Sequence, residues 1–405
     1  MPETSPIALA FSGGLDTSFC VPYLKEETGR EVMTVTVDTG GFTAEEKGQI
    51  AARSADLGAA GHRLVDARAD LWDRVLQYLV KGNVLRGGVY PLCVGPERVV
   101  QAEALADAAR ALGATAVAHG STGAGNDQIR FDTALRLLAD RGDEGALEIL
   151  TPIRSLSLSR EASTDYLRER GFPVEAKTTE YSVNRGLWGT TIGGKETHDT
   201  DGVLPEAAWP DTISPKDAPD DGRQLTIRFE QGVPVAIDGE SLDPVALVET
   251  LNREGAEHGV GRGIHVGDTI LGIKGRIAFE APGALTLIAA HRELEKLVLT
   301  QLQLVQKAGL GDLYGRLVHE GLFFDPICRD LEAFLDSTQR RVTGDVHVEW
   351  FKGAIHVQGA TSLHSLFDAG VARYGEDNAL WSGRDAEGFA QIYGLQARLA
   401  ARAGT

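Results

Sequence analysis

The sequence of 405 residues predicts an α/β protein that begins with a doubly wound, parallel β-sheet. Short apolar segments that resemble buried strands alternate with helical segments over residues 1–171. Two polar, glycine-rich stretches each follow such a strand and open a helix, which is where sheets of this kind bind ligands. After Gly171 the alternation ends, so we expect a second, α+β domain over residues 172–405.

The expected elements follow from periodicity, turn residues and caps. In the first domain we expect strands at residues 7–10, 31–37, 62–65, 115–118 and 147–150, and helices at 19–27, 44–57, 71–80, 97–112 and 159–170. In the second domain we expect a loop-rich segment at 177–221, hairpins at 225–237 and 342–358, a strand at 269–279, and helices at 243–253, 284–307, 330–340 and 385–402.

Composition limits the functional class. The formal charge of −18 disfavours nucleic acid as a partner, because phosphate contacts need clustered Lys and Arg. The three cysteines, Cys20, Cys93 and Cys328, lie far apart without metal-ligand spacing, as is typical of reduced thiols in the cytoplasm. The sequence shows neither a signal-peptide pattern nor an apolar run of about 18 residues. We therefore expect a cytoplasmic protein without a membrane span.

The first glycine-rich stretch, FSGGLDTS at residues 11–18, predicts a phosphate site. Gly13 and Gly14 allow the backbone to turn tightly, and the free N–H groups at the helix start attract an anion. The hydroxyls of Ser12, Thr17 and Ser18 add hydrogen-bond donors. No Lys follows the glycines, so this is not a Walker loop. The order of residues resembles the PP-loop of ATP pyrophosphatases, which cleave ATP between the α- and β-phosphates.

The second stretch, HGSTGAGNDQIR at residues 119–130, predicts a site for a small zwitterion. Arg130 offers a planar fork suited to a carboxylate, and Asp127 can hold an ammonium or an amide. Thr122 and Asn126 can bond a carboxylate or a carbonyl group. His119 lies beside these groups, with a functional and a structural role both open.

Together with further motifs, the two stretches resemble the argininosuccinate synthase family from residue 7 to residue 358. These motifs are YPL at 90–92, YS at 181–182, LWG at 187–189, HGVGR at 258–262 and GIK at 272–274. The resemblance implies a Rossmann-like PP-loop domain followed by a synthetase and multimerisation domain. It also implies ligation of citrulline and aspartate in arginine biosynthesis, with ATP and Mg²⁺, through a citrullyl-adenylate. It leaves the Mg²⁺ ligands unassigned.

The resemblance also implies roles for individual residues. The ATP-binding residues would be Ala10, Ser12, Gly13, Gly14, Leu15, Asp16, Thr17, Ser18, Val37 and Gly120. The aspartate-binding residues would be Thr122, Asn126 and Asp127, and the citrulline-binding residues Tyr90, Asn126, Arg130, Ser182 and Thr191. Asp16, Ser18 and Asp127 would be catalytic, mainly through positioning and charge stabilisation.

The chain departs from the family pattern in the segment 93–98, at Asn184, and at the end of the pocket that holds the amino-acid part of citrulline. There Gly267 stands where the family has a Glu, and Phe279 where it has a Tyr. Glycine removes a partner for an α-ammonium and opens volume, which suits an N-acetyl or N-succinyl citrulline, with Arg98 available for an added carboxylate. The alternative is plain citrulline, with Asp268 or Glu280 replacing the lost carboxylate.

Two more distant alternatives are another PP-loop adenylating enzyme and a nucleotide-binding protein without turnover. The family resemblance further implies a homotetramer. The terminal helix carries an apolar stripe, with Phe389, Ile392, Leu395 and Leu399 at helical spacing, so we expect it to dock on a neighbouring subunit rather than on its own.

Overall fold

A computed structural model describes residues 5–123, 125–139, 146–174, 181–367 and 380–404 of the chain. Ala124 of the second glycine-rich stretch and residues 175–180, which include part of the expected loop-rich segment, lie outside the described residues.

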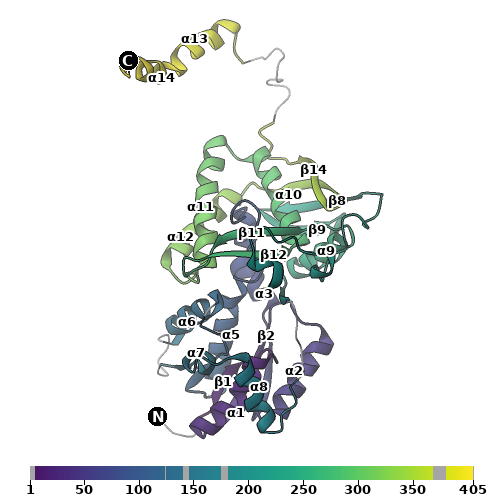
Figure 1. Ribbon diagram of the computed structural model, residues 1–405. Coiled ribbons are helices and arrows are strands. Elements are labelled where there is room, and N and C mark those ends of the chain that lie inside the picture. Colours follow the sequence, from purple (N-terminus) through teal and green to yellow (C-terminus); the bar gives the residue numbers. More distant parts are fainter. Residues whose placement is uncertain (1–4, 124, 140–145, 175–180, 368–379, 405) are drawn as a thin grey trace.

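The first part of the chain forms a five-stranded parallel sheet in the order β3-β2-β1-β4-β5. The strands are β1 (Ile7–Ala10), β2 (Val32–Asp38), β3 (Gly61–Asp66), β4 (Ala116–Ala118) and β5 (Glu148–Leu150). The helices around it are α1 (Leu15–Thr28), α2 (Ala44–Asp56), α5 (Glu97–Ala111), α6 (Asn126–Ala139), α7 (Pro152–Ser155) and α8 (Arg160–Glu169). Figure 1 shows this sheet and its helices at the N-terminal end of the molecule.

Helices cover both faces of this sheet because successive strand residues point to opposite sides. Ile7 and Leu9 of β1 pack in one hydrophobic core, together with Phe19 of α1. Ala8, between them in the sequence, packs in a second core with Leu105 of α5. The predicted doubly wound parallel sheet is therefore confirmed.

The chain between β3 and α5 is helical over a longer range than expected. It forms α3 (Arg68–Leu71), a π-helical segment (Trp72–Leu76) and α4 (Gln77–Lys81), where the sequence predicts a helix at residues 71–80. Its apolar residues belong to the core of the second half of the chain, so this helix links the two halves.

The second half contains two antiparallel sheets. One has the order β10-β9-β8-β13-β14 and the other the order β11-β12-β7-β6. The strands of the first are β8 (Arg223–Glu230), β9 (Val233–Ile237), β10 (Glu240–Ser241), β13 (Gly344–Phe351) and β14 (Ala354–Thr361). Those of the second are β6 (Ser182–Gly186), β7 (Gly189–Gly193), β11 (Arg262–Asp268) and β12 (Lys274–Glu280).

The predicted hairpins are confirmed, with Gly232 (φ 79°) in the turn of the first and Lys352–Gly353 in the turn of the second. The second sheet corrects the expected loop-rich segment, which contains β6 and β7. Residues 269–273 are a turn rather than the start of a strand, and β11 was not predicted.

The helices of the second half are α9 (Pro244–Glu257), α10 (Pro282–Val298), α11 (Gln301–His319), α12 (Pro326–Gln339), α13 (Gly383–Tyr393) and α14 (Leu395–Ala403). The single helix expected at residues 284–307 is two helices. Thr300 caps α11 by accepting a bond from Gln303 N, and Gln303 accepts one in return from Thr300 N. The expected terminal helix is likewise divided, at Gly394.

No helix within the described part of the chain has both the length and the apolar character needed to span a bilayer.

Candidate active site

Adjacent strands bring the two glycine-rich stretches together. β1 pairs with β4 in the centre of the parallel sheet, at the point where the strand order reverses, and each strand ends in one of the stretches. The two loops touch: a Cβ added at Gly120 would lie 3.2 Å from the backbone of Asp16 and Thr17. A cavity of about 1000 Å³ opens there, a size at the upper end of small-molecule pockets.

Most of the predicted site residues line this one cavity. They are Ala10, Ser12, Gly14, Leu15, Asp16, Thr17, Val37, Tyr90, Gly120, Thr122, Asn126, Asp127, Arg130, Ser182 and Thr191. Gly13 and Ser18 do not line it. The Ser18 hydroxyl is buried, donates to Gly13 O at 3.4 Å and accepts from Arg53 Nε at 3.4 Å, so it faces the fold rather than the cavity. The structure therefore does not bring the Ser18 hydroxyl to the cavity, and a contact of Ser18 with ATP stays a prediction.

The first loop keeps the start of α1 open to an anion. Gly14 is the N-cap residue and no side chain caps the helix, so the first N–H groups are left for a ligand. Gly13 has a φ of 75°, a backbone conformation that residues with a side chain rarely adopt. Thr17 Oγ1 donates to Gly14 O at 3.2 Å and holds the turn. Burial raises the pKa of Asp16, and Arg160 opposes that shift.

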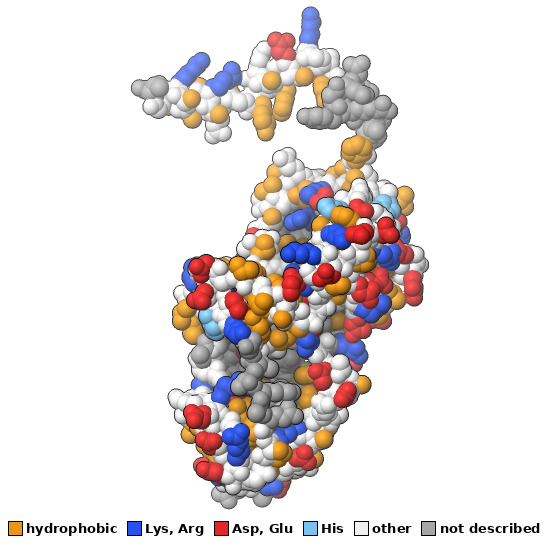
Figure 2. Space-filling model, turned by 45° about the vertical axis from the view of Figure 1, so that its right-hand side comes forward, with side chains coloured by type: hydrophobic (Ala, Val, Ile, Leu, Met, Phe, Trp, Pro, Cys, Tyr) orange, Lys and Arg blue, Asp and Glu red, His pale blue; other side chains and the backbone are white. Residues whose placement is uncertain are grey.

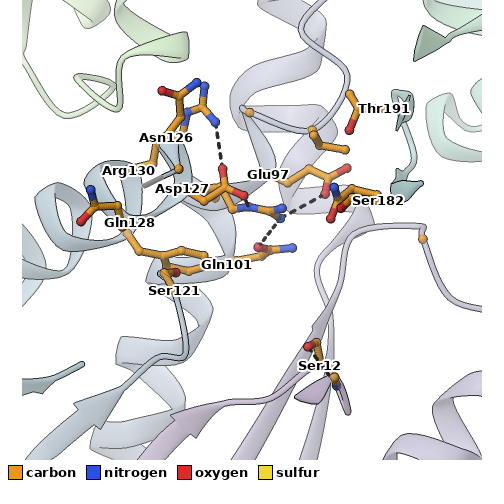
Figure 3. Close-up of a pocket in the computed structure, with 18 of the residues that line it drawn as sticks. Ser12, Glu97, Gln101, Ser121, Asn126, Asp127, Gln128, Arg130, Ser182 and Thr191 are labelled. Carbon is orange, nitrogen blue, oxygen red and sulfur yellow. Dashed lines mark hydrogen bonds and ion pairs between the residues drawn. The ribbon is translucent and has the colours of Figure 1, made fainter. Parts of the chain in front are cut away.

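In the first turn of α6, at the end of the second glycine-rich stretch, Asp127 lies between two guanidinium groups. Its Oδ2 lies 3.0 Å from Arg98 Nε and its Oδ1 2.8 Å from Arg130 Nη1 (Figure 3). Burial tends to raise the pKa of Asp127, but Arg98 and Arg130 together hold it below the ordinary value. Asp127 is thus a carboxylate whose position both arginines fix.

Arg130 has less freedom than the sequence suggests. Its Nε donates to His319 O at 2.7 Å, its Nη2 to His319 Nδ1 at 3.1 Å and its Nη1 to Asp127. The Arg98 side chain contacts Asp127 and Gln101. It is therefore not available for an added carboxylate, contrary to the expectation from the sequence. Figure 3 shows the Asp127 side chain between those of Arg130 and Gln101.

The structure also corrects the expectations for Gly267 and Phe279. Gly267 lines the cavity, but it opens no volume, because a Cβ there would lie 2.4 Å from His265 Nε2. Phe279 is buried, packs on Tyr90 (ring centroids 5.2 Å apart) and does not line the cavity. The His265 ring stacks on Tyr90 at 5.5 Å and lines the cavity beside Gly267.

Neither carboxylate proposed as a replacement is free. Glu280 is 1% exposed and does not line the cavity. It accepts bonds from Thr212 N at 2.9 Å and Asp211 N at 3.2 Å. Asp268 lines the cavity but pairs with Lys274 at 2.6 Å near the surface. Both carboxyl groups therefore already have partners.

Glu97 is a cavity residue that the sequence did not single out. It is 1% exposed, Thr39 Oγ1 donates to its Oε2 at 3.0 Å, and its Oε1 has no partner among the described residues. Burial, opposed by Arg98, raises the pKa of Glu97 to about 8, so its carboxyl group is mostly protonated at neutral pH. Gly186 of β6 has no side chain at the point where a Cβ would overlap Glu97, so only a glycine fits there. No sequence pattern marks this contact.

His119 has a structural partner at the edge of the cavity. Its Nε2 lies 3.0 Å from Asp132, whose other oxygen accepts from Arg154 at 2.6 Å. The ring also stacks on Phe131. These contacts orient the imidazole beside the loop, and they account for its burial without a catalytic role.

Comparisons with known proteins identify the family to which the chain belongs. Residues 6–173 match the family described as Arginosuccinate synthase N-terminal HUP domain, and residues 181–400 match the Arginosuccinate synthase C-terminal domain. The chain belongs to the argininosuccinate synthase family. The argininosuccinate synthase of Xylella fastidiosa is 42% identical over 405 residues, which covers 97% of this chain and 96% of the relative. Those of Methanopyrus kandleri (42%; 98% and 99% covered) and Methanocaldococcus jannaschii (39%; 96% and 96% covered) are similar.

Argininosuccinate synthases use ATP to ligate citrulline and aspartate, forming a carbon–nitrogen bond. The predicted family, fold class and ligase activity are therefore confirmed.

Proposed function

We propose that this chain joins the ureido group of a citrulline substrate to the amine of aspartate, with cleavage of ATP to AMP and pyrophosphate through a citrullyl-adenylate. The observation that carries the proposal is the contact between the β1–α1 and β4–α6 loops within one cavity. An anion site at the start of α1 adjoins a polar loop suited to an amino acid. The citrullyl-adenylate and aspartate, which react in the second step, can therefore meet in this cavity.

Each loop has a separate role in this proposal. The N–H groups at the start of α1 and the Ser12 hydroxyl hold phosphate oxygens, Thr17 lines the site and holds the turn beneath them, and Val37 and Gly120 lie near the adenosine. Thr122, Asn126 and Asp127 hold aspartate. Catalysis at phosphorus then depends on positioning and on stabilisation of charge.

We propose that Mg²⁺ accompanies the phosphates of ATP. The described residues contain no group of three or more His, Cys, Asp or Glu that could form a metal site by themselves. Magnesium commonly uses one or two carboxylates together with substrate phosphates. Asp16, on the first loop, is the carboxylate that fits this arrangement. We further propose that residues 1–171 form the ATP-binding domain, that residues 172–405 form the synthetase and multimerisation domain, and that the enzyme acts in the cytoplasm.

The products of ATP cleavage test the proposed reaction. With ATP, aspartate and citrulline substrates, we expect AMP and pyrophosphate. The Asp16→Asn variant should lower turnover at least about tenfold while changing the apparent aspartate KM less, because a charge-assisted contact at the phosphates is lost. Asp56→Asn, on the exposed end of α2, is the control. Detection of ADP and phosphate would contradict the assignment, and nucleotide binding without turnover would favour a non-catalytic protein.

We propose a homotetramer in which the C-terminal helices dock on a neighbouring subunit. No residue of α13 or α14 is buried, and Phe389, Ile392 and Tyr393 are 64%, 71% and 80% exposed. Figure 1 shows both helices apart from the rest of the chain, and Figure 2 shows hydrophobic side chains gathered along one side of them. An apolar helix face of this size needs a partner in water.

Removal of residues 385–405 is therefore expected to convert the tetramer into smaller species, as measured by analytical ultracentrifugation. Ile392→Asp should have the same effect, because a charge cannot be buried in an apolar interface without a partner. Gln391→Asp, in the same turn, is the matched control and should leave assembly unchanged. A tetramer that persists after truncation would refute the role of these helices.

A further inference from the structure

The end of the cavity around Gly267 is built from nitrogen-bearing side chains. Arg86, Arg130, His265 and His319 all line it. They come from the segment after α4, from α6, from β11 and from the end of α11, so only the fold brings them together. Two of them are guanidinium cations at any physiological pH.

His319 presents a buried donor to this space. Arg130 Nη2 can only donate, so the His319 Nδ1 that it contacts must be the acceptor, which leaves the ring proton on Nε2. That Nε2 is buried without a partner among the described residues, in a side chain 8% exposed. Burial, together with Arg130, Arg86 and His265, lowers the pKa of His319 to about 2, so the ring is neutral.

His265 has a second ring nitrogen without a partner. Its Nε2 is also buried without a partner among the described residues. Burial and the nearby Arg86 lower the pKa of His265, which keeps this imidazole neutral as well. Two ring nitrogens without a partner at one end of a cavity leave hydrogen-bonding capacity that a ligand could use.

Arg86 is the cation at this end that lacks a carboxylate. Its Nη2 donates to Asp268 O at 2.6 Å, and no described Asp or Glu lies within ion-pair distance of it. The nearby carboxylates are already engaged: Asp127 by Arg98 and Arg130, Asp268 by Lys274, and Glu320 by Arg316. An α-ammonium bound here would face a guanidinium and find no free carboxylate, which is costly.

We propose that this end of the pocket is an anion subsite for a citrulline whose α-nitrogen is acylated by a dicarboxylic acid. Acylation converts the ammonium into a neutral amide, and the added carboxylate pairs with the fork of Arg86 beside His319 Nε2. The inference rests on the proposed ligase function and names the class of its third substrate. The reacting ureido group lies at the other end of such a molecule, so the chemistry at ATP and aspartate is unchanged.

A panel of three substrates tests the proposal. Pyrophosphate release is measured with ATP, aspartate and either citrulline, N-acetylcitrulline or N-succinylcitrulline. We expect kcat/KM for N-succinylcitrulline to exceed that for citrulline at least about tenfold, a difference of about 1.4 kcal/mol, with N-acetylcitrulline below the succinyl compound. A preference for citrulline or N-acetylcitrulline would overturn the anion subsite while leaving the ligase function intact. Absence of AMP and pyrophosphate with all three would overturn both.

Variants of Arg86 assign the preference to this subsite. Arg86→Gln keeps an N–H donor for Asp268 O and should lower kcat/KM for N-succinylcitrulline at least about tenfold, with less than a twofold change for citrulline. Arg86→Glu should shift the preference towards citrulline, because it supplies a partner for the ammonium. Arg292→Gln, the same loss of charge on an exposed position of α10, is the control. An unchanged preference in both Arg86 variants would also overturn the proposal.

Discussion

Replacing Asp127 with alanine is expected to raise the apparent KM for aspartate at least about tenfold, since a charge-assisted hydrogen bond contributes roughly 1.5–3 kcal/mol. The carboxylate also lies between Arg98 and Arg130, at 3.0 and 2.8 Å. Without it the two guanidinium groups lose their shared counter-ion, and only the bonds of Arg130 to His319 and of Arg98 to Gln101 still hold them. We therefore expect kcat to fall as well, which a residue that only bound aspartate would not require.

The measurement is the initial rate of pyrophosphate release over a range of aspartate concentrations, with ATP and the ureido substrate saturating. Asp127→Asn keeps the shape of the side chain and separates the loss of charge from the loss of packing. Asp107→Ala removes a carboxylate from an exposed pair with Arg110 and should leave the kinetics unchanged. An aspartate dependence of Asp127→Ala equal to that of the unmodified enzyme would place the aspartate site elsewhere.

Glu295→Ala is expected to lower the free energy of unfolding by about 3–5 kcal/mol, the cost of leaving one partner of a buried ion pair alone. Lys307 is 2% exposed and Glu295 is 1% exposed, with Nζ and Oε2 3.0 Å apart. The same carboxylate accepts from Gln339 Nε2 at 2.6 Å and from Asn83 Nδ2 at 2.6 Å. Its removal would leave the polar groups of Lys307, Gln339 and Asn83 in the interior without this partner.

Urea unfolding, followed by circular dichroism, measures this effect. Burial lowers the pKa of Lys307 and Glu295 opposes that shift, so the variant should also favour a neutral lysine. Glu293→Ala, which breaks the exposed pair with Lys296 on the same helix, should cost less than about 1 kcal/mol. Equal losses of stability in the two variants would show that the buried pair contributes no more than the exposed one.

Local signals in the sequence were sufficient wherever neighbours along the chain decide the structure. The β1–α1 and β4–α6 loops, the alternation around the parallel sheet and the hairpin at Gly232 depend on residues that are close in sequence. The break between α10 and α11 could also have been predicted, because Thr300 and Gln303 have capping-box spacing. The apolar stripe continues on both sides of this cap, which led to the expectation of a single helix.

Strands β6, β7 and β11 could not be predicted in the same way. β6 and β7 are short and rich in Gly, Thr and polar residues, β11 contains two glycines, and β7 is completed by pairing with β12, as in the contact of Ile192 with Ala278. β6 and β7 form one local hairpin and β11 and β12 form another, but the sheet that joins the two hairpins depends on the pairing of β7 with β12, which are distant in sequence and which no local pattern connects.

The same division applies to the candidate site. The sequence by itself determined the two loops, the family and most of the cavity-lining residues on those loops, because these residues are consecutive in the chain and directly follow the ends of two adjacent strands. Only the tertiary structure decided that Ser18 faces inwards, that Arg98 and Arg130 hold Asp127, and that His265 fills the space beside Gly267. It also brought Arg86 and His319 to the same end of the pocket. The physical reason is that side-chain direction and charge balance depend on packing between segments that lie far apart in the sequence.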